Sequence, residues 1–393
     1  APAAGGIEWA AHIALHPVFC DPLGKSKSIP WVLIPETFDC LVPTGRIFCP
    51  SAMESYDLHA AARLGTLATV PAEALTLEHL TARNAAGNTP LHVAAKAGHL
   101  DQLPAILITA ETIALKNDAG YSPLHHAAIG GHLDKVPGDL ITAESLAARS
   151  NAGYTVFHLA AAHGHLDQIP AGLLTADVFS RRTDVGNTLL HEAAENGTLD
   201  RVPAPYVTAE ALAQKNIGGE TVLHVAAFNG HFDQVPGALL TVAALRELTG
   251  AGDTVFHAAA ISGHLGQIPA EFLTHDNLVL ASKSGFTAIH AAAETGQLEK
   301  IPRAQLTADL LLTRNDNGDT PLHAAAYEGH LDQVPAELLT PARVGTRNYD
   351  GMTVGRLALD RGFADQLPAA ARPRQMGPVR RFLHALGRAK AAV

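Results

Sequence analysis

The sequence predicts an all-α solenoid of about ten stacked helical repeats. A glycine recurs every 33 residues from Gly87 to Gly351, and a histidine recurs at the same spacing from His59 to His323. A proline follows the same register from Pro71 to Pro368. Three columns that hold one register without a gap indicate a row of like units. Each unit covers its apolar side with its neighbours.

The first part of each repeat predicts a helix, as residues 315–330 illustrate. Asn315 and Gly318 have the composition of a tight turn, in which glycine supplies a positive φ. Thr320 can then cap a helix that has Pro321 in its first turn. Gly329 is placed to end that helix as a C-cap.

The second part of each repeat predicts one or two shorter helical segments. Asp332 could cap the segment that follows it. Pro335 lacks an N–H and cannot lie inside a helix, so a short second helix is expected over residues 335–339. Thr340 can cap a further helical turn. We therefore expect two or three short helices per repeat and almost no strand.

Composition and charge favour a folded, soluble protein that does not bind nucleic acid. Of the 393 residues, 47% are apolar, only 5% are aromatic, and the formal net charge is −10. Six Lys or Arg and no acid follow from Arg372 onward, so the rest of the chain is more acidic still. Wrapping a nucleic acid requires many cations to neutralise phosphates, which an acidic chain does not supply.

The cysteines indicate neither a disulfide framework nor a zinc site. Cys20, Cys40 and Cys49 are the three cysteines, and their spacing contains no Cys-x-x-Cys. A reducing compartment follows, and we expect a cytoplasmic protein. No apolar run reaches the roughly 18 residues of a membrane span.

The array is expected to occupy residues 51–370, between two segments that lack the repeat. Residues 1–50 could form a small hairpin that caps the first repeat. Residues 371–393 predict a basic amphipathic helix with Phe382 and Leu386 on its apolar face. That helix could cap the last repeat, or it could meet a partner or an anionic membrane surface, which is a weaker alternative.

The repeat resembles a known family. The stretch from Asn88 to Leu100 reads N-T-P-L-H-V-A-A-K-A-G-H-L and resembles the ankyrin repeat, as do residues 121–133, 220–232 and 319–331. The resemblance implies an L-shaped helix–loop–helix unit, a curved stack and a protein-binding role. One feature departs from it, because the second helix carries a proline in every repeat, as in variant ankyrin repeats of bacterial proteins. We expect that helix to be shorter and to start later.

Two columns of polar residues are candidates for a binding site. The histidines of neighbouring repeats should lie roughly 10 Å apart, too far to share a metal ion, so we expect them to bond backbone of the turn or of the next repeat. A basic column could grip an acidic partner, or it could pair with an aspartate column or remain solvated. The basic column consists of Arg83, Lys116, Arg149, Arg182, Lys215, Arg314 and Arg347, and the aspartate column of Asp101, Asp134, Asp167, Asp200, Asp233 and Asp332.

The resemblance implies that a partner contacts the turn tips and the exposed face of the first helix. Aromatic side chains at exposed, variable positions are typical anchors of an interface. The predicted partner-binding residues are Tyr121, Tyr154 and Phe286 at the tips and Phe228, Tyr327, Lys96 and His126 on the first helices.

We therefore expect a monomeric, non-catalytic scaffold or adaptor for another protein, with no cofactor and no bound metal. The alternative is that the chain, which does not begin with Met, is the repeat-containing fragment of a larger effector or enzyme whose catalytic domain is absent. An enzyme built on the first fifty residues would need a base beside a nucleophilic cysteine, and fifty residues are few for a substrate pocket.

Overall fold

A computed structural model describes residues 56–373. Each repeat begins with an inner helix of seven or eight residues, packed beside the inner helices of the neighbouring repeats. The inner helices are α1 (Leu58–Leu64), α3 (Pro90–Ala97), α5 (Pro123–Gly130), α7 (Val156–His163), α9 (Leu189–Asn196), α11 (Val222–Asn229), α13 (Val255–Ile261), α15 (Ala288–Glu294), α17 (Pro321–Glu328) and α19 (Val354–Arg361).

An outer helix of four or five residues closes each repeat except the last described one. The outer helices are α2 (Leu77–Thr81), α4 (Ala110–Ile113), α6 (Ala143–Leu146), α8 (Ala176–Ser180), α10 (Ala209–Leu212), α12 (Val242–Leu245), α14 (His275–Leu278), α16 (Ala308–Leu311) and α18 (Pro341–Val344).

Short 3-10 helices join the inner helix to the outer one. The first of each repeat is η3 (Leu67–Thr69), η5 (Leu100–Gln102), η7 (Leu133–Lys135), η9 (Leu166–Gln168), η11 (Leu199–Arg201), η13 (Phe232–Gln234), η15 (Leu265–Gln267), η17 (Leu298–Lys300), η18 (Leu331–Gln333) and η20 (Ala364–Gln366). The second is η4 (Ala72–Ala74), η6 (Ala105–Leu107), η8 (Gly138–Leu140), η10 (Ala171–Leu173), η12 (Ala204–Tyr206), η14 (Gly237–Leu239), η16 (Ala270–Phe272) or η19 (Ala336–Leu338).

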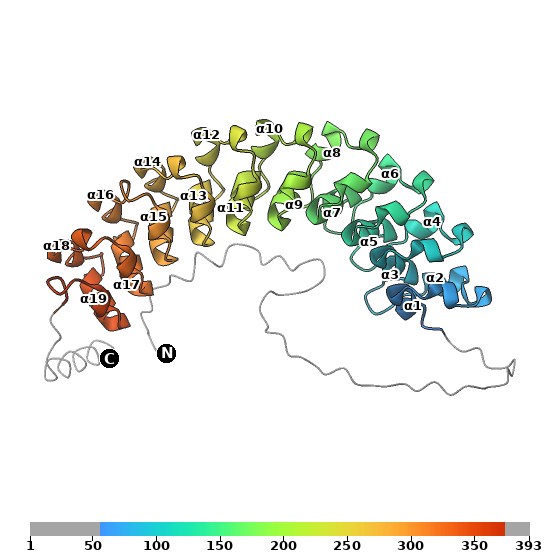
Figure 1. Cartoon of the computed structure of the whole chain (residues 1–393), viewed down its shortest axis with the longest axis horizontal. Coiled ribbons are helices and arrows are strands. Elements are labelled where there is room, and N and C mark those ends of the chain that lie inside the picture. Colours follow the sequence, from blue (N-terminus) through green and yellow to red (C-terminus); the bar gives the residue numbers. More distant parts are fainter. Residues whose placement is uncertain (1–55, 374–393) are drawn as a thin grey trace, which may run out of the picture. The chain divides into compact units, whose positions relative to one another are not determined.

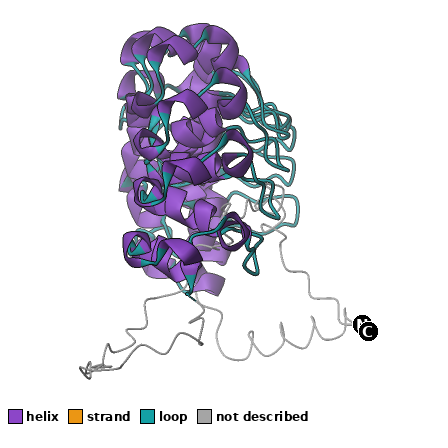
Figure 2. Cartoon of the chain, turned by 90° about the vertical axis from the view of Figure 1, so that its right-hand side faces the viewer, coloured by secondary structure: helices purple, strands orange, loops and turns teal. Residues whose placement is uncertain are grey.

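The repeats stack in sequence order into one curved array. Figure 1 shows the inner helices on the concave side of the array and the outer helices on its convex side. Figure 2, which looks along the stack, shows the helices in layers and the loops between repeats gathered along one edge. Residues 56–373 contain no β-strand, only three isolated bridges within turns. The predicted all-α solenoid is therefore confirmed.

The inner helices form where their capping signals predict, as α11 illustrates. Thr221 is the N-cap in an extended conformation, and its hydroxyl and the His224 side chain complete a capping box. Gly230 ends the helix at a φ of 78°, and its N–H bonds the Ala226 carbonyl. Leu223, with Ala226 and Ala227 three and four residues later, is fully buried and joins the core that runs through the array.

The second helix of the repeat is split by its proline, more strongly than expected. Pro335 is the N-cap of η19, a single 3-10 turn, and Thr340 then caps the separate four-residue helix α18. The expected helix over residues 335–339 is thus a 3-10 turn, because a proline at this point cannot take part in an α-helical hydrogen-bond ladder. The predicted cap at Asp332 is wrong, since His330 is the N-cap of η18 and makes no side-chain capping bond.

The histidine column joins each repeat to the next, as the sequence predicts. In the central repeats the histidine Nδ1 accepts the N–H of the threonine cap, as in the 3.2 Å bond from Thr221 to His224. The proton therefore lies on Nε2, which donates to the Asp253 carbonyl of the following repeat at 3.2 Å. The equivalent bond recurs from His59 to His323 with acceptors 29 residues ahead, except that His158 bonds the Arg181 carbonyl.

A glutamine column, which the sequence analysis did not single out, forms a second set of bonds between repeats. The Gln234 amide nitrogen donates to the Gly197 carbonyl, and its oxygen accepts the Leu199 N–H, both at 2.9 Å. Gln168, Gln267 and Gln366 make the same pair of bonds. Each glutamine satisfies two backbone groups left over at the end of the preceding inner helix.

Replacing Gln234 with leucine should loosen the junction between two repeats by about 2 kcal/mol. The substitution leaves the Leu199 N–H and the Gly197 carbonyl without a partner, and each buried unsatisfied group costs about 1–3 kcal/mol. Faster hydrogen exchange of the Leu199 amide would report the loss. Gln102 is the matched control, because its oxygen accepts no bond from the described residues. If Gln234→Leu and Gln102→Leu accelerated hydrogen exchange of the corresponding leucine amides equally, the glutamine column would not be what holds neighbouring repeats together.

Candidate protein-binding surface

Each inner helix turns one side toward the core of the array and the opposite side toward the concave surface. On α11 one side holds the fully buried Leu223, Ala226 and Ala227, and the opposite side holds Val225, which is also buried, with the half-buried Phe228 and Asn229. We call this surface the inner face. It is defined as the four columns that recur every 33 residues from Asn88, Val93, Lys96 and Ala97 to Met352, Leu357, Asp360 and Arg361.

The aromatic residues predicted at the turn tips pack against histidines of their own repeats. The Tyr121 ring lies edge-on to His125, with centroids 5.5 Å apart. Tyr154 approaches His158 in the same way, with centroids 6.3 Å apart, whereas the Phe286 and His290 rings are tilted by 31° with centroids 5.4 Å apart. These rings cover the buried histidines. Only part of each ring therefore remains exposed for contact with a partner.

Two predicted contact residues are not exposed. Tyr121 and His126 are each only 7% exposed, and their rings lie against each other with centroids 6.3 Å apart. The His126 ring also meets His92 of the preceding repeat at 5.2 Å. The expectation that these two side chains lie on the surface is therefore wrong, because close stacking of the inner helices covers them.

The other predicted helix residues lie half-buried on the inner face but do not form one cluster. Lys96 lies on α3, Phe228 on α11 and Tyr327 on α17, and other inner helices separate them. The Arg361 guanidinium lies 3.3 Å from the centre of the Tyr327 ring. Ile261, the neighbour of Phe228 in the same column, is 37% exposed and is not among the predicted contact residues. Its position 33 residues after Phe228 is the feature of the sequence that indicates the same place on the inner face.

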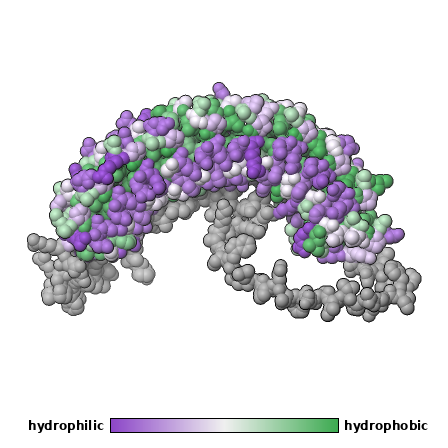
Figure 3. Space-filling view, viewed as in Figure 1, coloured by the Kyte–Doolittle hydropathy of each residue, from purple (hydrophilic) through white to green (hydrophobic). Residues whose placement is uncertain are grey.

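Charge divides the inner face into two parts. From Asn88 to His163 its four columns contain no acid. From Glu192 onward they contain Glu192, Glu195, Glu220, Asp253, Glu294, Asp319, Glu328 and Asp360. Lysine and arginine occur in these columns only at Lys96 and Arg361. Figure 3 shows hydrophilic residues in a band along the inner part of the visible side of the array.

Three carboxyl groups of the acidic part, those of Glu192, Glu294 and Asp319, have raised pKa values. Burial raises the pKa of Glu192 to about 8, the nearby Glu195 adds to this, and a bond of 3.0 Å from the Asn187 amide opposes it. Burial raises the pKa of Glu294 too, and Glu328 of the next repeat raises it further. Burial is the largest cause of all three shifts, and a neighbouring acid adds to each of them.

The basic column joins neighbouring repeats through bonds to backbone carbonyls, and Arg83, Arg149 and Lys215 also form partly exposed ion pairs. The Lys116 ammonium donates to the Arg149 carbonyl at 2.8 Å, and Arg149 donates to the Arg182 carbonyl at 2.9 Å, so each head reaches backbone 33 residues ahead. The expected pairing with the aspartate column is wrong. Where the basic column meets an acid, the partner lies outside the aspartate column, as with Asp184, 2.7 Å from Arg149, and Glu247, 2.9 Å from Lys215.

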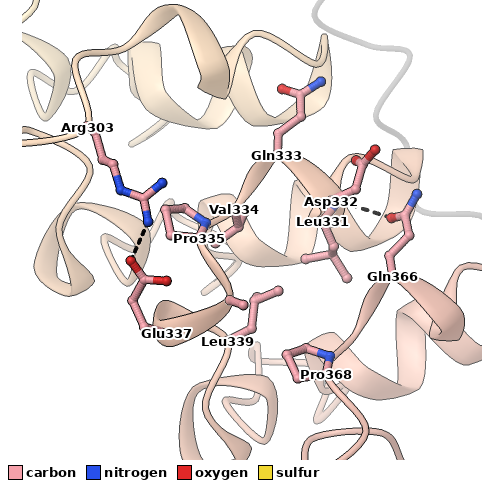
Figure 4. A pocket seen from close by; sticks show the side chains of 11 residues that line it. Arg303, Leu331, Asp332, Gln333, Val334, Pro335, Glu337, Leu339, Gln366 and Pro368 are labelled. Atoms are coloured by element: carbon pink, nitrogen blue, oxygen red, sulfur yellow. Dashed lines mark hydrogen bonds and ion pairs between the residues drawn. The ribbon is translucent and has the colours of Figure 1, made fainter.

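An open pocket lies between the last two repeats, away from the inner face (Figure 4). Its volume is about 570 Å³, and its walls include Pro335, Pro368 and Arg303. Arginine stands here where the other repeats have alanine or glycine. Its guanidinium is paired with Glu337 at 2.5 Å, and the Gln366 oxygen already accepts the Leu331 N–H. The polar groups of the pocket thus bond one another rather than converging on its centre.

The described residues offer no metal centre and no membrane span. Residues 56–373 contain no group of three or more His, Cys, Asp or Glu side chains placed to hold a metal ion. No helix in this part of the chain has the length and apolar character needed to cross a bilayer. The three cysteines, the expected cap at residues 1–50 and the helix expected beyond residue 373 lie outside the described residues.

Comparison with known protein families agrees with the fold. A family model of three consecutive ankyrin repeats matches residues 58–138, and a model of a single ankyrin repeat matches residues 317–348. No curated protein matches the sequence. Ankyrin repeats are generally protein–protein interaction modules, and the proteins that contain them are generally non-catalytic. The two matches lie near opposite ends of one uninterrupted register of helical repeats, and the chain therefore contains ankyrin repeats.

Proposed function

We propose that the array is a non-catalytic scaffold that binds a partner protein along its inner face and the adjoining turn tips. The observation that supports this proposal is that some columns of the repeat keep one residue type whereas others vary. The columns that pack the repeats together hold almost the same residue throughout, whereas the column of Lys96 runs Lys, Ile, Ala, Glu, Phe, Ile, Glu, Tyr, Asp. Packing between repeats does not require one residue type in this column, so its side chains can vary to suit a partner.

The inner face also has the composition that an interface requires. Phe228 and Ile261 place two large apolar side chains on adjacent helices, with polar residues around them. Apolar anchors inside a polar surround supply most of the binding energy in protein interfaces. Because many repeats contribute one surface, the partner can be contacted over several inner helices at once.

A photo-reactive amino acid at position 261 should crosslink the partner, whereas the same group at position 106 should not. Ile106 is the matched control, since it is an isoleucine that is 83% exposed on another part of the array. Once the partner is identified, Ile261→Ala should weaken its binding about tenfold, as expected for an anchor residue. Ile106→Ala should leave the affinity unchanged. Equal crosslinking from both positions, or from position 106 alone, would exclude the inner face.

A further inference from the structure

In the acidic part of the inner face, the order of acidic and apolar side chains along the successive helices indicates what the surface binds. Its apolar side chains, Phe228 and Ile261, lie on α11 and α13. Acids lie on both sides of them, with Glu195 on α9 before and Glu294 on α15 and Glu328 on α17 after. Neighbouring helices stack about 10 Å apart, so α9 and α15 are separated by about 30 Å. Along the three helix columns of the inner face the order is therefore acidic, apolar and acidic, and two further acids, Glu220 and Asp253, lie at the turn tips of the central repeats.

The acids after the apolar centre are close enough to repel each other. Glu294 is half-buried, Glu328 of the next repeat is exposed, and the charge of Glu328 disfavours ionisation of Glu294. No lysine or arginine lies in the four columns of the inner face between Lys96 and Arg361. A cation brought by a partner would relieve this repulsion, whereas an anion would increase it.

We infer that this part of the inner face binds a helix of a partner protein that has an apolar centre and basic residues at both ends. The inference rests on the proposed function and names the chemistry of the partner. A helix of about 20 residues is about 30 Å long, which matches the distance from α9 to α15. Its apolar centre would contact Phe228 and Ile261, and its basic ends would lie beside Glu195 and beside Glu294 and Glu328. Nucleic acids and anionic membranes carry charge of the wrong sign for this surface.

Binding of synthetic peptides to the full chain tests the order of charges. The first peptide has about 20 residues, with lysines at both ends and alanines and leucines between them. A second has the same composition with the lysines gathered at the centre, and a third has glutamates in place of the lysines. We expect the first to bind at least about tenfold tighter than either of the others, and more weakly as salt is raised. Equal affinity of the first two peptides would overturn the inference, and so would tighter binding of the third.

A pair of variants tests the location. Glu294→Gln combined with Glu328→Gln should weaken binding of the first peptide about tenfold, because two charge contacts are lost. Asp233→Asn combined with Glu271→Gln removes the same charge from exposed residues outside the inner face and should have no effect. Equal loss in both double variants would mean that only the net charge matters, which would overturn the inference.

The inference and the proposed function fail separately. If position 261 crosslinks a partner but the lysine-ended peptide shows no preference, the inner face binds a protein of other chemistry, and only the inference is lost. If the peptide binds as expected but position 261 crosslinks no partner, the surface selects basic helices in isolation, and the proposed function is lost.

Discussion

Lowering the pH from about 7 to about 5 should unfold the array, because its histidines are buried in the neutral form. Burial lowers the pKa of His92, His125, His158, His191, His224 and His290 from 6.5 to about 4, and hydrogen bonds to backbone carbonyls oppose this only in part. In each case Nδ1 already accepts a hydrogen bond at the helix cap, and Nε2 already donates to a backbone carbonyl, which for all but His158 lies 29 residues ahead. A second proton would remove the acceptor at the cap.

The sign and size of the effect follow from the difference in pKa between the folded and unfolded states. The folded pKa is the lower one, so each histidine contributes stability that is complete above about pH 6.5 and is lost as the pH falls through about 4. At about pH 5 the loss is about 2 kcal/mol for each histidine. Six such losses sum to about 12 kcal/mol, comparable to the whole stability of a typical domain.

Far-UV circular dichroism during chemical unfolding, repeated between about pH 7 and about pH 4.5, would measure this dependence. His224→Gln should make the fall in stability with pH less steep, whereas His79→Gln, at an exposed histidine, should not. Glu192 acts in the opposite direction. Its raised pKa gives stability that is present below about pH 4.5 and is lost as the pH rises through about 8. A flat profile between about pH 6.5 and 4.5 would show that the histidines are not coupled to folding.

The features that the sequence predicts well are those whose chemistry is the same in every repeat. Thr221, His224 and Gly230 belong to columns in which one residue type supplies a cap, a bond to the next repeat or a positive φ. Such requirements act within one or two turns of backbone, so a fixed spacing reveals them. The family resemblance, the all-α fold and the bonds that the histidine column makes to backbone groups follow from this regularity.

The features that the sequence predicts poorly depend on contacts between repeats. Gln234 belongs to a column that also contains Lys135, Arg201 and Lys300, so its role is hidden by the mixed composition. In the repeat of Lys300, Gln297 from the neighbouring column accepts the Leu265 N–H instead. The burial of Tyr121 depends on how closely two inner helices approach, which no spacing in the sequence fixes. The acceptors of the basic column are backbone carbonyls, which carry no sequence signal.

Replacing Gly219 with alanine should destabilise the central repeats by about 3 kcal/mol or more, from two causes that the chain allows to be separated. Gly219 has a φ of 76°, where an added Cβ costs about 1–2 kcal/mol. A Cβ at Gly219 would also lie 2.7 Å from the backbone nitrogen of Gly250 in the next repeat. That nitrogen donates to the Gly218 carbonyl at 2.7 Å, so relief of the clash would separate two turns that are hydrogen bonded.

Two further glycines isolate the causes. Gly351 occupies the same column with the same φ of 76°, but nothing lies within 4 Å of an added Cβ, so alanine there should cost only the conformational part. Gly172 lacks a positive φ and also has open space around it, so alanine there should be neutral or stabilise by up to about 1 kcal/mol. Hydrogen exchange measured repeat by repeat would compare the three variants, because the end of an array opens more readily than its centre. If Gly219→Ala and Gly351→Ala cost the same, the close approach of neighbouring turns contributes nothing, and the column is glycine for its φ alone.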